Sequence, residues 1–254
     1  MKNFLHLTNP AGEVPGCLTP SGASPTLRHT KPVIIWGAYL AAKATGDFEQ
    51  FRCYREKMQA LLTYWHSPRR RDAATGLHVW ADQMESGADD LVFSDVASAH
   101  TPGWSEVEHA FRVSSPDIMT FLVREHRAYA LFLRRWAEAS PEGVTPAVEA
   151  EISAQLTLVA SLRQSVNTYL WHWQDEAAGV GWYCGYDIRT RAQLSHRTYQ
   201  MAWPLWEGLH QTDAQRDAAV RAILAPDMRC CSGVRSTSSL DARYSNDNII
   251  VPYR

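Results

Sequence analysis

Paired cysteine motifs and long apolar runs are both missing from this sequence, and each absence excludes classes of protein. The 254 residues include five cysteines, an odd number, and none of them has the Cys-x-x-Cys spacing of a redox or zinc motif. We therefore expect reduced thiols, as in a cytoplasmic protein. No stretch approaches the roughly 20 apolar residues of a membrane-spanning helix, and the first residues lack the apolar run of a signal peptide. The sequence predicts a cytoplasmic location and no membrane partner.

An excess of charge of either sign is also missing. The formal net charge is −2 and the pI is near 6.5, so we expect no nucleic-acid partner. The ten histidines include no His-x-His or His-Glu-x-x-His pattern, which argues against a zinc site. No Ser-His-Asp or Cys-His arrangement has supporting sequence around it, and we expect neither a metal nor a cofactor.

Acidic and aromatic residues, by contrast, gather in the segment His78–Phe93. Its carboxylates follow Trp80 and stand at Asp82, Glu85, Asp89 and Asp90. Ser86-Gly87 predicts a bend between Glu85 and Asp89, because glycine gives the backbone freedom and serine competes for backbone hydrogen bonds. Crowded carboxylates beside a tryptophan raise the pKa of one of them, as a general acid acting on a sugar requires. The alternative is a solvated acidic loop or an oxygen cluster for calcium, although the spacing does not fit an EF-hand.

Within this segment the residues Glu85–Asp90, ESGADD, resemble the ESGxDN motif of glycoside hydrolase family 63 and its bacterial relatives. That group includes the mannosylglycerate and glucosylglycerate hydrolases and resembles the trehalases more distantly. The resemblance implies an (α/α)6 barrel on which Asp89 is the general acid. Two departures are Met84, where the family often has tryptophan, and Asp90, where it has asparagine.

Further stretches match the family in the same order. LWHWQDEAAGVGWYCGYD, which ends at Asp187, resembles a linker between a helix and a short hairpin, and Met201–Gly208 resembles a "fxPLwaG" segment that opens an inner helix. Gly233–Thr237 and Tyr244–Tyr253 resemble a "GIRS…Y…N…Y" passage. The resemblance covers nearly the whole chain. The candidate substrate-binding residues are Trp36, Trp80, Gln83, Glu85, Asp90, Trp182, Tyr183 and Arg235, with core or hairpin roles as the alternative for Trp182 and Tyr183.

The expected fold is all-α: an incomplete (α/α)6 toroid, with residues 1–254 as a single partial catalytic domain and 78–115 as its active-site loop region. Helical spacing of apolar residues and the start and stop signals predict six helices in three pairs, half of what the closed barrel needs. A strong helix begins at Pro116 with Ser115 as its cap. Glu125 falls on its apolar stripe, which predicts either a pair with an arginine such as Arg124 or a place in a pocket.

The predicted activity is inverting hydrolysis of a small α-glycoside whose aglycone carries a carboxylate, such as mannosylglycerate or glucosylglycerate. The resemblance puts the general base beyond the residue that matches Arg254, so no base is assigned and the chain resembles a C-terminally truncated catalytic domain. An inactive homologue or a carbohydrate-binding remnant is therefore the main alternative. An epimerase that uses His126 and His172 has no further support in the sequence. The oligomeric state is left open.

Overall fold

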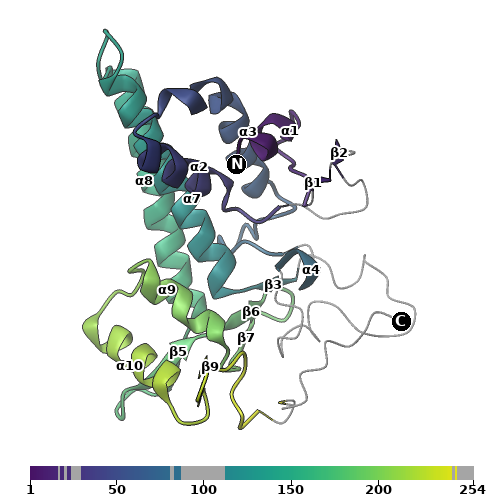
Figure 1. Ribbon diagram of the computed structural model, residues 1–254. Coiled ribbons are helices and arrows are strands. Elements are labelled where there is room, and N and C mark those ends of the chain that lie inside the picture. The colour runs from purple at the N-terminus through teal and green to yellow at the C-terminus, as the bar shows by residue number, and fades with distance from the viewer. Residues whose placement is uncertain are drawn as a thin grey trace. The chain divides into compact units, whose positions relative to one another are not determined.

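The computed structural model describes residues 1–16, 18–19, 22–23, 30–80, 83–86, 112–241 and 244. The chain divides into two compact units. The first comprises Met1–His78 with Phe121–Arg163, and the second comprises Val79–Thr120 with Gln164–Arg254. Both contain helices, and short antiparallel sheets accompany them (Figure 1).

The first unit is mainly helical and has an aromatic core around Phe132. Phe132 contacts Tyr39, Phe48, Phe51 and Trp136, with ring centroids 5.0–5.9 Å apart. Helix α1 packs against α2 and α3 (Figure 1). The elements are α1 (Lys2–Leu7), β1 (Leu18–Thr19), β2 (Gly22–Ala23), α2 (Ile34–Thr45), a 3₁₀ helix (Glu49–Tyr54), α3 (Arg55–Trp65), α7 (Pro116–Glu138) from Phe121 onward and α8 (Pro146–Ser165) as far as Arg163.

Glu125 on α7 is fully buried against the start of helix α2. The expectation that an arginine is its partner is wrong. Its carboxylate accepts hydrogen bonds from the backbone N–H groups of Ile35, at 3.0 Å, and Trp36, at 2.8 Å. These are N–H groups that a helix start leaves without partners. Burial raises the pKa of Glu125 to about 7, against the lowering effect of these N–H groups. The guanidinium of Arg124 instead lies 4.4 Å from the ring centroid of Trp36.

Three histidines of the first unit form a chain of hydrogen bonds. His78 Nε2 lies 3.2 Å from His66 Nδ1, and His66 Nε2 lies 2.7 Å from His126 Nε2. His126 Nδ1 lies 2.7 Å from the amide oxygen of Gln155 on α8. Burial, then the neighbouring His126 and Arg71, lower the pKa of His66 from 6.5 to about 3. Burial likewise lowers the pKa values of His78 and His126, so the three rings are neutral at pH 7.

The second unit combines short sheets with short helices. The strands β3, β6 and β7 form one antiparallel sheet in that order, and β4 pairs with β5 in the predicted hairpin. The inner helix expected at Met201 is only one turn long. The elements are α4 (Gln83–Ser86), β3 (Val113–Ser114), a π-helix (Val166–Leu170), β4 (Trp171–Asp175), β5 (Val180–Tyr183), β6 (Gly185–Asp187), β7 (Ala192–Leu194), a 3₁₀ helix (Tyr199–Ala202), α9 (Trp203–Trp206), α10 (Asp213–Leu224), β8 (Arg229–Cys230) and β9 (Gly233–Val234).

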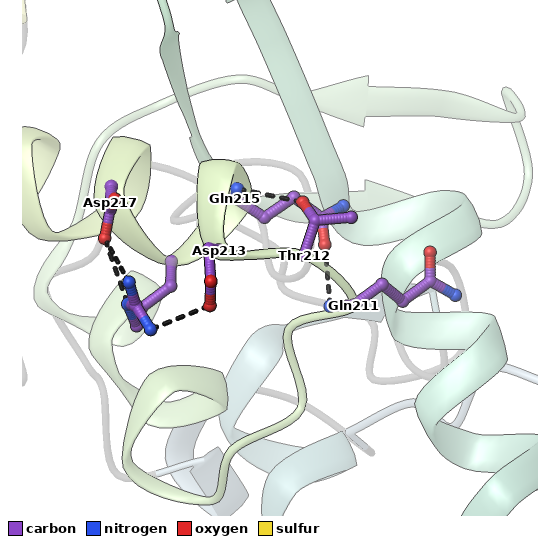
Figure 2. A network of polar contacts seen from close by, with 6 residues as sticks. Gln211, Thr212, Asp213, Gln215 and Asp217 are labelled. Carbon is purple, nitrogen blue, oxygen red and sulfur yellow. Dashed lines mark hydrogen bonds and ion pairs between the residues drawn. The ribbon is translucent and has the colours of Figure 1, made fainter.

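Helix α10 packs against β5 and begins at a side-chain cap (Figures 1 and 2). The sequence predicts a cap at Thr212 or Asp213, and the structure has it at Thr212. The Thr212 hydroxyl accepts a hydrogen bond from the Gln215 backbone N–H at 3.1 Å. The Gln215 side-chain oxygen accepts in turn from the Gln211 N–H at 2.8 Å. Threonine followed three residues later by glutamine is the pattern of a capping box, in which each side chain satisfies a backbone donor at the helix start.

Replacing Thr212 by alanine removes this cap, so we expect Thr212→Ala to lower the free energy of unfolding by about 1 kcal/mol. Urea unfolding followed by circular dichroism measures the change. Thr212→Ser keeps the hydroxyl and should retain most of the stability. Thr157, exposed within α8, donates its hydroxyl to the Ser153 carbonyl, and Thr157→Ala is a matched control that should change stability little.

The histidine chain predicts a loss of stability in acid. The pKa of His66 is lower in the folded protein than in the unfolded chain, so between about pH 6 and pH 4 the unfolded chain binds the additional proton. The free energy of unfolding should therefore fall as the pH is lowered. Each such group contributes about 1.4 kcal/mol per pH unit, and His66→Gln should reduce the slope by about that amount.

The contribution of Glu125 to the free energy of unfolding changes with pH in the opposite direction, so Glu125 provides the control. Its pKa is higher in the folded protein than in the unfolded chain, so folding binds a proton between about pH 4.5 and pH 7. This contribution falls as the pH rises. Glu125→Gln removes it and should steepen the loss of stability in acid, as measured by urea unfolding at a series of pH values. Equal slopes for the wild type, His66→Gln and Glu125→Gln would contradict both assignments.

Candidate functional site

The residues that precede the predicted general acid lie in the second unit. Trp80 and Glu85 are both 3% exposed, and Gln83 begins the short helix α4. Asp89 and Asp90, the predicted acid and its neighbour, lie outside the described residues. The geometry can therefore be built on the residues before the acid and on those that contact them.

Trp80 belongs to a buried polar cluster at the start of α7. Its backbone N–H points to the carbonyl of Val113 on β3, at 3.4 Å. The indole N–H donates to the hydroxyl of Ser115 at 2.9 Å, and the Asp117 carboxylate lies 3.4 Å from the same nitrogen. The main chain and the indole of Trp80 are thus both held by the residues that open α7.

Asp117 is the acceptor at the centre of this cluster. One carboxylate oxygen accepts from the Ser115 hydroxyl and from the Ile118 backbone N–H, the latter at 2.8 Å. The other accepts from the side-chain amide of Gln200 at 2.8 Å. Ser115, expected to cap α7, instead accepts from Trp80 and donates to Asp117. Such a carboxylate, 3% exposed and surrounded by donors, fixes its neighbours in place.

Trp182 and Tyr183 lie next to each other on β5, so their side chains point to opposite faces of the hairpin. The Trp182 indole donates to the Ser195 carbonyl at 3.2 Å and contacts the His172 ring. The Tyr183 hydroxyl donates to Asn167 at 3.1 Å. They are 5% and 1% exposed, respectively. Both therefore have hairpin and core contacts, and the role of either in binding a sugar stays a prediction.

Asp187, at the end of β6, is buried and forms an ion pair with the partly exposed Arg112. The guanidinium donates to one carboxylate oxygen at 2.9 and 2.5 Å, and the backbone N–H of Arg189 donates to the other oxygen at 2.9 Å. Burial acts to raise the pKa of Asp187, but Arg112 and the backbone N–H groups outweigh it and hold the pKa below its ordinary value. Asp187 is therefore a paired anion within the β3–β6–β7 sheet.

The two remaining predicted residues are at opposite parts of the sequence. Trp36 lies on α2 in the first unit, against Arg124. Arg235 follows β9 in the second unit, where its guanidinium bonds the Tyr244 hydroxyl and the Pro226 carbonyl, each at 3.3 Å. Of the candidate residues, Trp80, Gln83 and Glu85 share one short segment and Trp182 and Tyr183 share one strand. The structure leaves the sugar-binding role of all of them as a prediction.

Sequence reasoning did not identify the partners of Trp80. The sequence predicts Ser115 only as a helix cap, and neither Asp117 nor Gln200 carries a signal of a contact with Trp80. Among the described residues, no group of three or more His, Cys, Asp or Glu side chains is arranged to hold a metal ion. In the same part of the chain, no helix is long and apolar enough to cross a membrane.

Solved structures show the same fold at low sequence identity. An uncharacterized conserved protein from Thermus thermophilus aligns with a TM-score of 0.67 and 14% identity, over 95% of this chain and 68% of that one. The GH63 mannosylglycerate hydrolase of the same organism, in complex with glucose, aligns with a TM-score of 0.60 and 14% identity, over 89% and 64%. Neutral trehalase Nth1 from Saccharomyces cerevisiae aligns with a TM-score of 0.57 and 14% identity, over 84% and 46%.

The chain thus spans less than two thirds of the hydrolase and about half of the trehalase. No curated protein matches the sequence. The model of a family described as "Mannosylglycerate hydrolase MGH1-like glycoside hydrolase domain" matches residues 5–249. This match covers nearly the whole chain, and the mainly helical fold agrees with part of the GH63 (α/α)6 domain. The protein therefore belongs to the MGH1-like glycoside hydrolases of family 63.

Proposed function

We propose that this protein is an inverting glycoside hydrolase that acts on a small α-glycoside, with Asp89 as the general acid. The observation that carries the proposal is the family match over residues 5–249, which includes the ESG motif and Asp89. Membership in a glycosidase family implies a carbohydrate substrate. Mannosylglycerate and glucosylglycerate are the substrates we propose, because their aglycone carries a carboxylate and the family model is named for a mannosylglycerate hydrolase.

In the proposed reaction Asp89 protonates the oxygen of the leaving group. A second carboxylate, usually about 6.5–9.5 Å from the acid, activates a water molecule on the opposite face of the sugar ring. Asp90 adds a charge beside the acid, which would raise the pKa of the acid if both side chains are buried. Glu85 binds sugar hydroxyls or braces the acidic segment, and its burial agrees with either role. Trp80 provides an aromatic wall for the site.

We assign no general base among the buried carboxylates of Asp117, Glu125 and Asp187. Asp117 and Asp187 each accept several hydrogen bonds within the second unit, and Glu125 is occupied by the backbone N–H groups of α2. All three are structural. We propose that the helices belong to an incomplete (α/α)6 toroid and that residues 78–115 form the active-site loop region of one partial catalytic domain.

A cytoplasmic location without a cofactor completes the proposal. Cys53, Cys184, Cys230 and Cys231, the cysteines in the described part of the chain, are all free thiols, which suits a reducing compartment. Solutes such as mannosylglycerate are also expected inside cells.

The second candidate is a protein that binds a carbohydrate without turning it over. The observation in its favour is that the carboxylates of Asp117, Glu125 and Asp187 are all occupied by donors, because binding requires no general base.

Release of the aglycone from mannosylglycerate, glucosylglycerate and trehalose tests the proposal directly. We expect turnover of one of the two glycerate glycosides, and we expect Asp89→Asn to lower its rate about 10²–10⁴-fold, since the amide cannot protonate the leaving group. Asp213→Asn is the matched control, because Asp213 is exposed on α10 and pairs with Arg216 on the same helix (Figure 2). Its rate should equal that of the wild type.

Calorimetric titration separates the two candidates. Binding of a glycoside without turnover by the wild type would support the binding protein and overturn the hydrolase. Turnover that survives Asp89→Asn would contradict the assignment of the acid. Turnover of trehalose alone would contradict the proposed substrate class.

A further inference from the structure

The first unit contains a cavity of about 840 Å³ to which no role has been given above. Helices α3, α7 and α8 and the turn after α3 line it. A cavity of this size is in the range that binds small molecules. Its polar lining residues include the histidine chain, a carboxylate with its donors, and side chains whose donor groups are available to a ligand.

The histidine chain forms one wall and offers the cavity only ring surface. His66 uses both ring nitrogens, one toward His78 and one toward His126. The amide oxygen of Gln155 faces His126 Nδ1, so that nitrogen carries the proton and donates. His126 Nε2 then accepts from His66, and His66 Nδ1 accepts from His78. Gln155 therefore determines which nitrogen carries the proton in each of the three neutral rings.

The same bond determines what Gln155 presents to the cavity. Its amide oxygen is occupied by His126, so the group it offers is the amide NH₂, which only donates. Ser67 and Arg71 also line the cavity. Among the residues that the structure describes, neither the Ser67 hydroxyl nor the Arg71 guanidinium has a hydrogen-bond or ion-pair partner. Three side chains around the cavity thus have donors available, and one of them is a cation.

The carboxylate of the cavity, Glu151, already has three donors. It accepts hydrogen bonds from Gln59 at 2.8 Å and Tyr129 at 2.9 Å, and it forms an ion pair with Arg55. Burial raises the pKa of the Tyr129 phenol, so this hydroxyl keeps its proton and remains a donor. Arg55 cancels the charge of Glu151, and the neutral histidines add none. The charge left around the cavity is that of Arg71.

We propose that this cavity binds a compact anion, a carboxylate or a phosphate group, through Arg71, with Ser67 and Gln155 as neutral donors. A guanidinium binds either group through two parallel hydrogen bonds. A metal ion does not fit, because the nitrogens of His66 point at two other rings and not at a common centre. The uncompensated charge of Arg71 favours an anion over a neutral sugar. The site uses none of the residues proposed for glycoside hydrolysis.

The test measures the binding of inorganic phosphate and of acetate separately, by amide chemical-shift titration at pH 7.5. Sodium chloride keeps the ionic strength constant, because surface charges respond to salt in general. At least one anion should shift the amides of the turn 67–71 and of α8 near residue 155 in a saturable way. The arm that responds identifies the phosphate or the carboxylate as the preferred group.

Two variants test the assignment of the residues. Arg71→Gln removes the cation and should weaken binding about tenfold or more, in the range of one charge-assisted hydrogen bond. Gln155→Glu keeps an acceptor for His126 but replaces the amide donors by a negative charge, and should abolish binding. Arg69→Gln is the matched control, since Arg69 is an exposed neighbour that does not line the cavity, and it should bind like the wild type.

Three results would overturn the proposal. The first is that neither anion produces saturable shifts in the folded wild-type protein. The second is that Arg71→Gln binds as tightly as the wild type. The third is that Arg69→Gln weakens binding as much as Arg71→Gln, which would indicate a general effect of positive charge on this turn. Circular dichroism of each variant checks that the helices are intact.

Discussion

A buried carboxylate needs hydrogen-bond donors, and this requirement determines which segments pack against helix α7. Near its first turn Asp117 takes donors from Trp80, Ser115, Ile118 and Gln200 within the second unit. Further along, Glu125 takes the backbone N–H groups that begin α2 within the first unit. The bonds from Trp80, Gln200 and α2 join segments far apart in the sequence. An unmatched carboxylate at either position would be strongly destabilising, so the segments that supply the donors are held to the helix.

The sequence predicts the regular elements well because their signals are local. Helix α7 begins at Pro116 and buries the expected stripe, α10 is capped by Thr212, and β4 and β5 pair as a hairpin. The inner helix predicted at Met201 is much shorter than expected. The structure has only a 3₁₀ turn and α9 before Gly208, which adopts a φ of +68°. Glycine is suited to that conformation and ends the helix there. The short sheets show that the second unit is not purely helical.

The candidate site is less predictable because its contacts are long-range. The bond between Gln200 and Asp117 joins residues 83 positions apart, and that between Ile35 and Glu125 joins residues 90 apart. Periodicity shows that Glu125 is buried but does not identify its partner. The sequence likewise does not identify the partners of His66. This residue follows the last turn of α3 and is the middle one of three hydrogen-bonded imidazoles. Motif resemblance predicts Asp89 as the general acid, and local patterns carry no information on the general base.

In the second unit, the number of residues in the π-helix Val166–Leu170 determines how the next segment is oriented. It presents Asn167 to the interior, where the side chain donates to the Leu209 carbonyl at 2.7 Å and accepts from Tyr183. A π turn holds one more residue than an α turn. Deleting one residue there would relax the turn to α geometry and rotate the next segment by about 100° about the helix axis. The β4–β5 hairpin starts at the next residue, so its orientation depends on the number of residues in this turn as much as on their identity.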